Sequence, residues 1–151
     1  MGAFAKMHGL GNDFVVIDAR DAAIDMPPAR AAAIADRHKG IGCDQLIIVG
    51  RSDRADVSMR IFNADGSEVE ACGNATRCIP LFVGHDVRIE TAAGILDAKM
   101  SDGHVSVDMG KPRFEWDAIP LAYAMDTRSL PTSWEDLPMI WRQSIPRGSA
   151  R

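Results

Sequence analysis

The stretch NADGSEVEACGNATRC, Asn63 to Cys78, combines a turn, a short strand and the start of a helix. Asp65-Gly66 is a strong hairpin turn signal, so we expect Asn63 and Cys72 on neighbouring paired segments. Cys72 then leads into Gly73-Asn74, where a helix is expected to begin. The first N–H groups of a helix have no partner within it and carry the positive end of its dipole. Such a position favours a reactive thiolate.

The same N–H groups also predict an anion site. Gly73 has no side chain to cover its backbone N–H, so a carboxylate or a phosphate can approach the helix start closely. The stretch therefore predicts a base or nucleophile, Cys72, beside an anion clamp at Gly73 and Asn74. The alternative is a buried structural cysteine, which is the commoner role for an arbitrary Cys-Gly pair.

The composition is that of a globular protein of one domain, with 151 residues, 46% of them apolar and 25% charged. A net charge of −4, with scattered Lys and Arg, argues against nucleic-acid binding. No apolar stretch approaches the ~20 residues of a membrane span. Residues 1–11 lack the apolar core of a signal peptide. The cysteine content predicts reduced thiols, so we expect a cytoplasmic location.

Apolar runs and apolar–polar alternation predict several short strands. The expected strands are Ala3–His8, Phe14–Asp18, Leu46–Val49, Val57–Ile61, Val87–Glu90, Leu96–Met100 and Val105–Met109. The first two form a hairpin, and the last three follow one another as an antiparallel meander. Because strands outnumber helices, the expected class is α+β with a strongly bent or barrel-like sheet.

Two helices are expected. One covers Ala29–Lys39, follows a Pro-Pro pair and ends at Gly40; His38 is interpreted as completing the core face of its last turn. The other covers Gly73–Val83. Pro80 removes one backbone donor from it, so we expect this helix to be short or broken.

The sequence changes character near its C-terminal end. Residues 129–151 show no period of 2 or 3.6, so we predict a domain over residues 1–125 and an irregular tail over residues 126–151. Exposed Trp134 and Trp141 in this tail would be unusual on a stable monomer surface. We interpret the stretch as poorly ordered, as docking on something outside the chain, or as an aberrant terminus.

Several chemistries are disfavoured. The sequence has no Walker-type phosphate loop and no Gly-x-Gly-x-x-Gly motif. Cys43, Cys72, Cys78 and His38 lack the close spacings of zinc ligands, so no metal is expected. Cys43 is interpreted as a small core residue. Cys78 follows Cys72 by six positions, which in a helix turns its side chain well away.

Three blocks together resemble the N-terminal half of the diaminopimelate epimerase family. They are KMHGLGNDFVVID (Lys6 to Asp18), RHKGIGCDQLIIV (Arg37 to Val49) and RIFNADGSEVEACGNATRC (Arg60 to Cys78). The resemblance runs from about Ala3 to about Met125 and passes through TAAG (Thr91 to Gly94) and VDMGKP (Val107 to Pro112).

This resemblance implies a fold and an activity. The family's fold is a pair of similar halves, each a barrel-like antiparallel or mixed sheet around a central helix, with the site in the cleft between them. The family interconverts LL- and meso-diaminopimelate in lysine and cell-wall precursor synthesis, with neither pyridoxal phosphate nor a metal. One cysteine of each half takes part: a thiolate removes the α-proton, and a thiol returns a proton on the opposite face.

The resemblance also assigns roles to the matching positions. Cys72 is implied as the acid/base of the first half, with the backbone of Gly73 and Asn74 holding the substrate α-carboxylate. Phe14 is expected to pack near the site. The side chains implied to bind the small-molecule substrate are Asn12, Gln45 and Asn63.

The family's second half, with its own cysteine, has no counterpart in the sequence. A single base would return the proton to the face it left, so we expect the chain alone to be inactive or very poor. A complementary C-terminal half or a partner chain would complete the site. Two alternatives stay open: another cysteine-dependent amino-acid racemase, such as a proline-racemase relative, and a non-catalytic binding or dimerising domain.

Overall fold

The computed structural model describes residues 4–119, 121, 123–134 and 137–142. The chain divides into two compact units, Met1–Met109 and Gly110–Arg151, and each is described by itself. The domain over residues 1–125 and the tail over residues 126–151 stay a prediction. No helix in the described ranges is long and apolar enough to cross a membrane.

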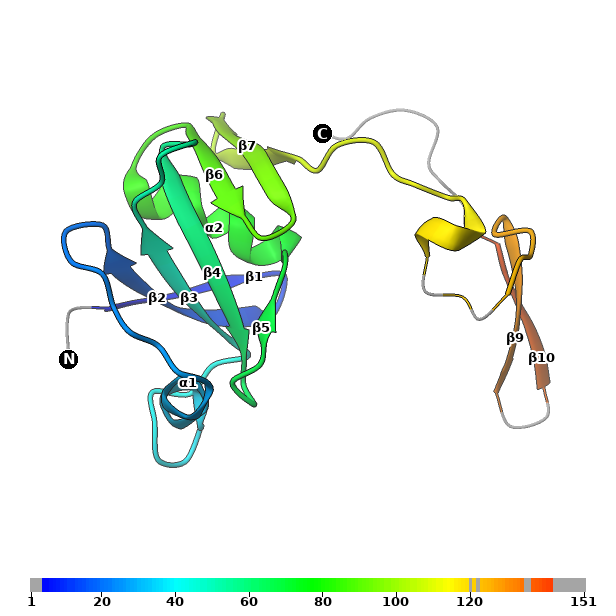
Figure 1. Cartoon of the computed structure of the whole chain (residues 1–151), viewed down its shortest axis with the longest axis horizontal. Coiled ribbons are helices and arrows are strands. Elements are labelled where there is room, and N and C mark those ends of the chain that lie inside the picture. The colour runs from blue at the N-terminus through cyan, green and yellow to red at the C-terminus, as the bar shows by residue number, and fades with distance from the viewer. Residues whose placement is uncertain (1–3, 120, 122, 135–136, 143–151) are drawn as a thin grey trace. The chain divides into compact units, whose positions relative to one another are not determined.

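The first unit is built on one mixed sheet (Figure 1). Its strands are β1 (Phe4–Gly9), β2 (Asn12–Ala19), β3 (Gln45–Gly50), β4 (Val57–Asn63), β5 (Glu68–Val69), β6 (Val87–Thr91), β7 (Gly94–Ser101) and β8 (His104–Asp108). The order across the sheet is β1-β2-β3-β4-β6-β7-β8, with β5 paired to β4. The β2–β3 and β4–β6 pairs are parallel, and the other pairs are antiparallel. The predicted hairpin and meander are confirmed.

The sheet curls around helix α2 (Gly73–Val83). Strands β1 and β8 lie at opposite ends of the strand order, yet both contact α2, and so do β6 and β7. A flat sheet could not bring both of its ends to one helix. The predicted bent, barrel-like mixed sheet around a central helix is therefore confirmed.

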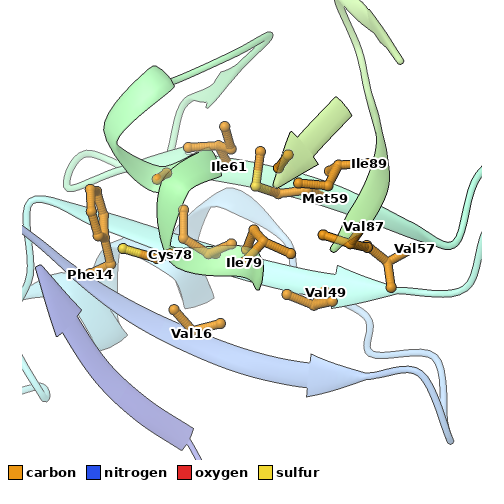
Figure 2. Packing of buried hydrophobic residues seen from close by; sticks show 13 residues of the cluster. Phe14, Val16, Val49, Val57, Met59, Ile61, Cys78, Ile79, Val87 and Ile89 are labelled. Atoms are coloured by element: carbon orange, nitrogen blue, oxygen red, sulfur yellow. The ribbon is translucent and has the colours of Figure 1, made fainter. Parts of the chain in front are cut away.

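Alternation along the central strands divides the core into two parts. On one face, Cys78 and Ile79 of α2 pack among Phe14, Val16 and Val49 (Figure 2). On the other face, helix α1 (Pro28–Ala35) covers a second apolar cluster. That cluster includes Val15, Ile17, Leu46, Ile48 and Phe62. Because strands β2 and β3 are buried on both faces, their sequences are continuous apolar runs.

Helix α1 is shorter than predicted. It ends at Ala35, because Asp36 leaves the helical conformation with ψ 121°. The Asp36 carboxylate accepts hydrogen bonds from the backbone N–H groups of His38 and Lys39 at 2.7 and 2.9 Å, which offers these groups an alternative to the helix. His38 is exposed and lies outside the helix, so its interpretation as a core-face residue was wrong.

Pro80 does not break helix α2, contrary to the expectation. The helix continues from Gly73 to Val83 and ends at Gly84, whose left-handed φ of 88° is typical of a C-cap. The Gly84 N–H donates to the Pro80 carbonyl at 2.8 Å. Ile79 and Pro80 are both buried, and their packing against the sheet offsets the donor that proline removes.

The second unit contains a short 3-10 helix, Trp116–Ala118, and an antiparallel hairpin of β9 (Ser129–Trp134) with β10 (Leu137–Arg142). The Thr127 hydroxyl donates to the Phe114 carbonyl. The side chains of Trp134 and Trp141 lie outside the described part of the structure, so their predicted docking role stays a prediction.

Candidate functional site

Three predicted substrate-binding amides share one face and one end of the sheet. Asn12 alternates with Phe14 along β2, and Phe14 belongs to the core that packs on α2. By the same alternation, Gln45 and Asn63 lie on the α2 face of β3 and β4. In the strand register Gln45 is paired with Phe14 on one side and with Asn63 on the other. The sheet therefore brings the side chains of Asn12, Gln45 and Asn63 to the edge of the apolar core on the α2 face.

Cys72 is delivered to the start of a helix, as predicted. It is the N-cap of α2, with extended backbone at φ −147° and ψ 111°, and it follows the short strand β5. The Thr76 N–H and hydroxyl each donate to the Cys72 carbonyl at 2.9 Å, which fixes the first turn. No side chain caps the helix, so its first N–H groups are left for another partner.

The sulfur of Cys72 lies beside a side-chain amide from the first residue of β2. The Asn12 Nδ2 group donates toward Cys72 Sγ at 3.9 Å, across 60 positions of sequence. Both side chains are half-buried. The structure therefore places one side-chain donor, together with the start of a helix, beside this sulfur.

The backbone at the helix start is open on one side and tightly packed on the other. A Cβ atom placed on Gly73 would meet no atom within 4 Å, so a ligand can approach the amides of Gly73 and Asn74. A Cβ atom placed on Gly9 would lie 3.2 Å from the Asn74 carbonyl oxygen. A side chain at Gly9 would require its neighbours to shift by a few tenths of an ångström, so glycine favours the close packing of the chain before Asn12 against α2.

Gln45 and Asn63 belong to a chain of hydrogen bonds that reaches the turn after β4. Gln45 Nε2 donates to Asn63 Oδ1 at 3.1 Å, and Asn63 Nδ2 donates to Ser67 Oγ at 3.1 Å. The Ser67 hydroxyl donates to Asp65 Oδ1 at 2.6 Å. This bond and the bond from the Ser67 N–H lower the pKa of Asp65 below its ordinary value of 3.8. The sequence indicated only a tight turn at these positions: Asp65 was interpreted as a solvated carboxylate, and Ser67 was given no role.

The chain leaves one atom without a partner. Among the described residues, the only buried side-chain nitrogen or oxygen that makes no hydrogen bond is Oε1 of Gln45. An unpaired buried acceptor is costly, at about 1–3 kcal/mol, and is uncommon in folded proteins.

The other two cysteines differ from Cys72. Cys43 and Cys78 are buried, and burial raises the pKa of each thiol above its ordinary value of 9.0. The interpretation of Cys43 as a core residue is confirmed. Cys78 Sγ lies 3.6 Å from the Asn74 carbonyl oxygen, inside the α2 core. In the described part of the chain, no three His, Cys, Asp or Glu side chains are grouped closely enough to hold a metal ion.

A cluster of four charged side chains, called the charged cluster below, lies next to these residues in sequence. Asp13 bonds Lys6 at 2.7 Å and Arg37 at 2.6 Å, and Arg37 also bonds Asp44 at 2.7 Å. The backbone N–H groups of Asp13 and Asp44 each donate to the other's carboxylate at 3.0 Å. The cluster ties the start of β2 to the start of β3, and hence Asn12 to Gln45.

A family model described as diaminopimelate epimerase matches residues 4–115. The chain belongs to the diaminopimelate epimerase family. The three sequence blocks that predicted this family all fall within the matched residues. The roles assigned to Cys72, Asn12, Gln45, Asn63, Gly73 and Asn74 within the family stay predictions.

Curated relatives are similar over most of the chain. A protein of Zymomonas mobilis named diaminopimelate epimerase is 68% identical over 136 residues, which is 89% of this chain and 51% of the relative. Another with the same name, from Rhizorhabdus wittichii, is 66% identical over 89% of this chain and 49% of the relative. The chain thus spans about half the length of the curated relatives it matches. Because 89% of the chain is covered, the similarity extends beyond Met125.

The chain is also similar to solved structures at lower sequence identity. A phenazine biosynthesis protein of the PhzF family from Bacillus anthracis is 24% identical, with a TM-score of 0.49 over 71% of this chain and 40% of that chain.

Proposed function

We propose that this chain supplies one half of a cofactor-independent epimerase that interconverts LL- and meso-diaminopimelate in lysine and cell-wall precursor synthesis. Family membership and the names of the curated relatives support the activity and the substrate. The observation that carries the proposal is the position of Cys72. It is a half-buried cysteine at an uncapped helix N-terminus, with an amide donor 3.9 Å from its sulfur.

In the proposed first step, the Cys72 thiolate removes the α-proton of the substrate. The C–H bond breaks, an S–H bond forms, and the electron pair stays on the α-carbon and spreads into the carboxylate. An amino-acid α-proton is very weakly acidic, so this charge needs oriented donors. The free N–H groups of Gly73 and Asn74 are positioned to bind the carboxylate, and they require no reorganisation at the moment of reaction.

Inversion needs a second proton donor on the opposite face of the carbon. A thiol that gives its proton to the carbanion leaves as a thiolate, so the two sulfurs exchange their protonation states in each turnover. Cys43 and Cys78 are buried in the two apolar cores and are unsuited to this role. We therefore assign the second thiol to a complementary C-terminal half or a partner chain.

The amides complete the proposed site. Asn12, Gln45 and Asn63 offer uncharged donors and acceptors for the polar groups of a small-molecule substrate. All the cysteines of the described residues are free thiols, which fits a reducing compartment, so a cytoplasmic location is part of the proposal.

The test is exchange of the α-hydrogen of LL-diaminopimelate in D₂O. The 151-residue chain is assayed alone and combined with the C-terminal half of the Zymomonas mobilis relative, and deuterium uptake and stereochemistry are measured. We expect inversion only in the combined sample. Cys72→Ala should lower the rate by about a thousandfold, whereas Cys43→Ala, in the opposite core, should leave it nearly unchanged.

Two results would count against the proposal. Turnover that survives Cys72→Ala would remove this residue from catalysis. Inversion by the 151-residue chain alone would show that no second half is needed.

A further inference from the structure

Four side chains, called the amide relay below, connect an exposed turn to the proposed site. Asp65 and Ser67 are exposed, Asn63 and Gln45 are half-buried, and each side chain bonds the next. The turn itself is held firmly. The Asn63 N–H donates to the Ser67 carbonyl at 2.8 Å, and a Cβ atom on Gly66 would overlap the backbone of Pro28.

The hydrogen bonds of the amide relay all run in one donor-to-acceptor direction, and Asp65 sets that direction. An ionised carboxylate only accepts hydrogen bonds, so the Ser67 hydroxyl must donate its single proton to it. The Ser67 oxygen then accepts from the Asn63 NH₂ group, which turns the Asn63 carbonyl toward Gln45. Gln45 can pair with that carbonyl only through its own NH₂ group.

The consequence is that the carbonyl oxygen of Gln45 is turned away from the relay. This oxygen is buried and has no hydrogen-bond partner among the described residues. Gln45 stands on the α2 face of the sheet, where the core ends and where Asn12 approaches Cys72. An acceptor held in this way can take an N–H or O–H donor from outside the chain, and a ligand's donor can replace water there.

We propose that Asp65 and Ser67 are positioning residues that orient the Gln45 carbonyl to accept from an ammonium group of the substrate. The inference rests on the proposed function, in which the ligand is an amino acid with two ammonium and two carboxylate groups. A carboxylate placed against the Gln45 oxygen would bring two acceptors together, so the amide relay selects ammonium over carboxylate at this point.

The first test changes the hydroxyl without changing charge. Ser67→Ala breaks the amide relay, and Ser67→Thr keeps its hydroxyl. The probes are LL-diaminopimelate and pimelate, which has the same carbon chain and both carboxylates but no ammonium group. Affinities are measured by calorimetry with the 151-residue chain combined with the complementary half. Ser67→Ala should lower the affinity ratio of diaminopimelate to pimelate by about tenfold, the scale of one hydrogen bond. Ser67→Thr should restore it.

The second test changes the group that sets the direction. In Asp65→Asn the side chain can donate as well as accept, so the amides are free to reverse and the same ratio should fall. Glu70→Gln removes a charge from the same exposed segment without touching the relay, and it should leave the ratio unchanged. The side-chain NH₂ resonances of Gln45 and Asn63 should shift in Asp65→Asn and Ser67→Ala even without ligand.

The outcomes separate the inference from the function on which it rests. If the wild type binds diaminopimelate but Ser67→Ala and Asp65→Asn lower both affinities equally, Asp65 and Ser67 are merely structural and the inference is overturned. If Glu70→Gln lowers the ratio as much as Asp65→Asn, general charge explains the effect and the inference is again overturned. If the wild type binds neither probe, the proposed function fails, and the inference fails with it.

Discussion

The two faces of the sheet differ most at the end where β2 and β3 begin. Asp13 alternates with Val15 and Ile17 on the α1 face and joins the charged cluster with Lys6, Arg37 and Asp44. On the α2 face, the corresponding positions carry only uncharged amides. Both faces are polar at the same end of the same strands, yet their hydrogen bonding differs.

The charged cluster is closed on itself. Each of the four carboxylate oxygens of Asp13 and Asp44 accepts at least one hydrogen bond from within it. The amide relay, by contrast, ends in a buried acceptor without a partner. A closed network stabilises the fold, whereas an open one lowers stability and is useful only when a ligand completes it. The charged cluster on the α1 face holds the strands in place, and the α2 face is the one on which we propose that the substrate binds.

The largest expected effect on stability comes from the charged cluster on the α1 face. Asp13→Asn removes the charge that Lys6 and Arg37 share, so we expect the free energy of unfolding at pH 7 to fall by about 1–2 kcal/mol. Urea denaturation measures this loss. A loss of only a few tenths of a kcal/mol in the free energy of unfolding would mean that the charged cluster is an ordinary set of surface ion pairs.

The same variant makes a prediction about pH. The hydrogen bonds from Arg37, and then from Lys6, hold the pKa of Asp13 well below its ordinary value of 3.8. A carboxyl with a lowered native pKa adds stability above its unfolded pKa and loses it as pH falls through the native pKa. The stability difference between wild type and Asp13→Asn should therefore be full above about pH 5 and shrink as the pH falls below 3.8. A difference that stays constant down to acid pH would contradict this account.

A smaller effect on stability is expected from the amide relay on the α2 face. Gln45→Leu removes the buried unpaired oxygen and extends the apolar core, but it also removes the donor to Asn63 Oδ1. Because these effects oppose each other, the free energy of unfolding should stay within about 1 kcal/mol of the wild type. The same substitution should abolish the preference for diaminopimelate over pimelate. If Gln45→Leu destabilises the chain as much as Asp13→Asn does, the amides are structural and the contrast between the faces fails.

The strands could be predicted from the sequence because alternation and apolar runs are local signals. Phe14–Asp18 and Leu46–Val49 fall inside β2 and β3, and the Asp65-Gly66 turn was found from its own residues. The helix ends were less predictable. Asp36 ends α1 with a side-chain hydrogen bond, and tertiary packing carries α2 through Pro80.

The site could be predicted only in part. The position of Cys72 between a short strand and a helix start could be predicted, because the turn, the strand and the helix start each have local sequence signals. The contact between Asn12 and Cys72 depends on the close approach of Gly9 to α2, and the amide relay depends on the pairing of β3 with β4. Such contacts join residues far apart in sequence, and no local pattern signals them.

In the proposed site, Cys72 is the accessible sulfur over which the substrate lies. Iodoacetamide modification of each cysteine, followed by peptide mass spectrometry on the chain combined with the complementary half, tests this directly. We predict that Cys72 reacts well before buried Cys43 and Cys78, and that LL-diaminopimelate slows its reaction in proportion to the bound fraction. Modification of Cys72 as slow as that of the other two, or unchanged by saturating LL-diaminopimelate, would contradict the account.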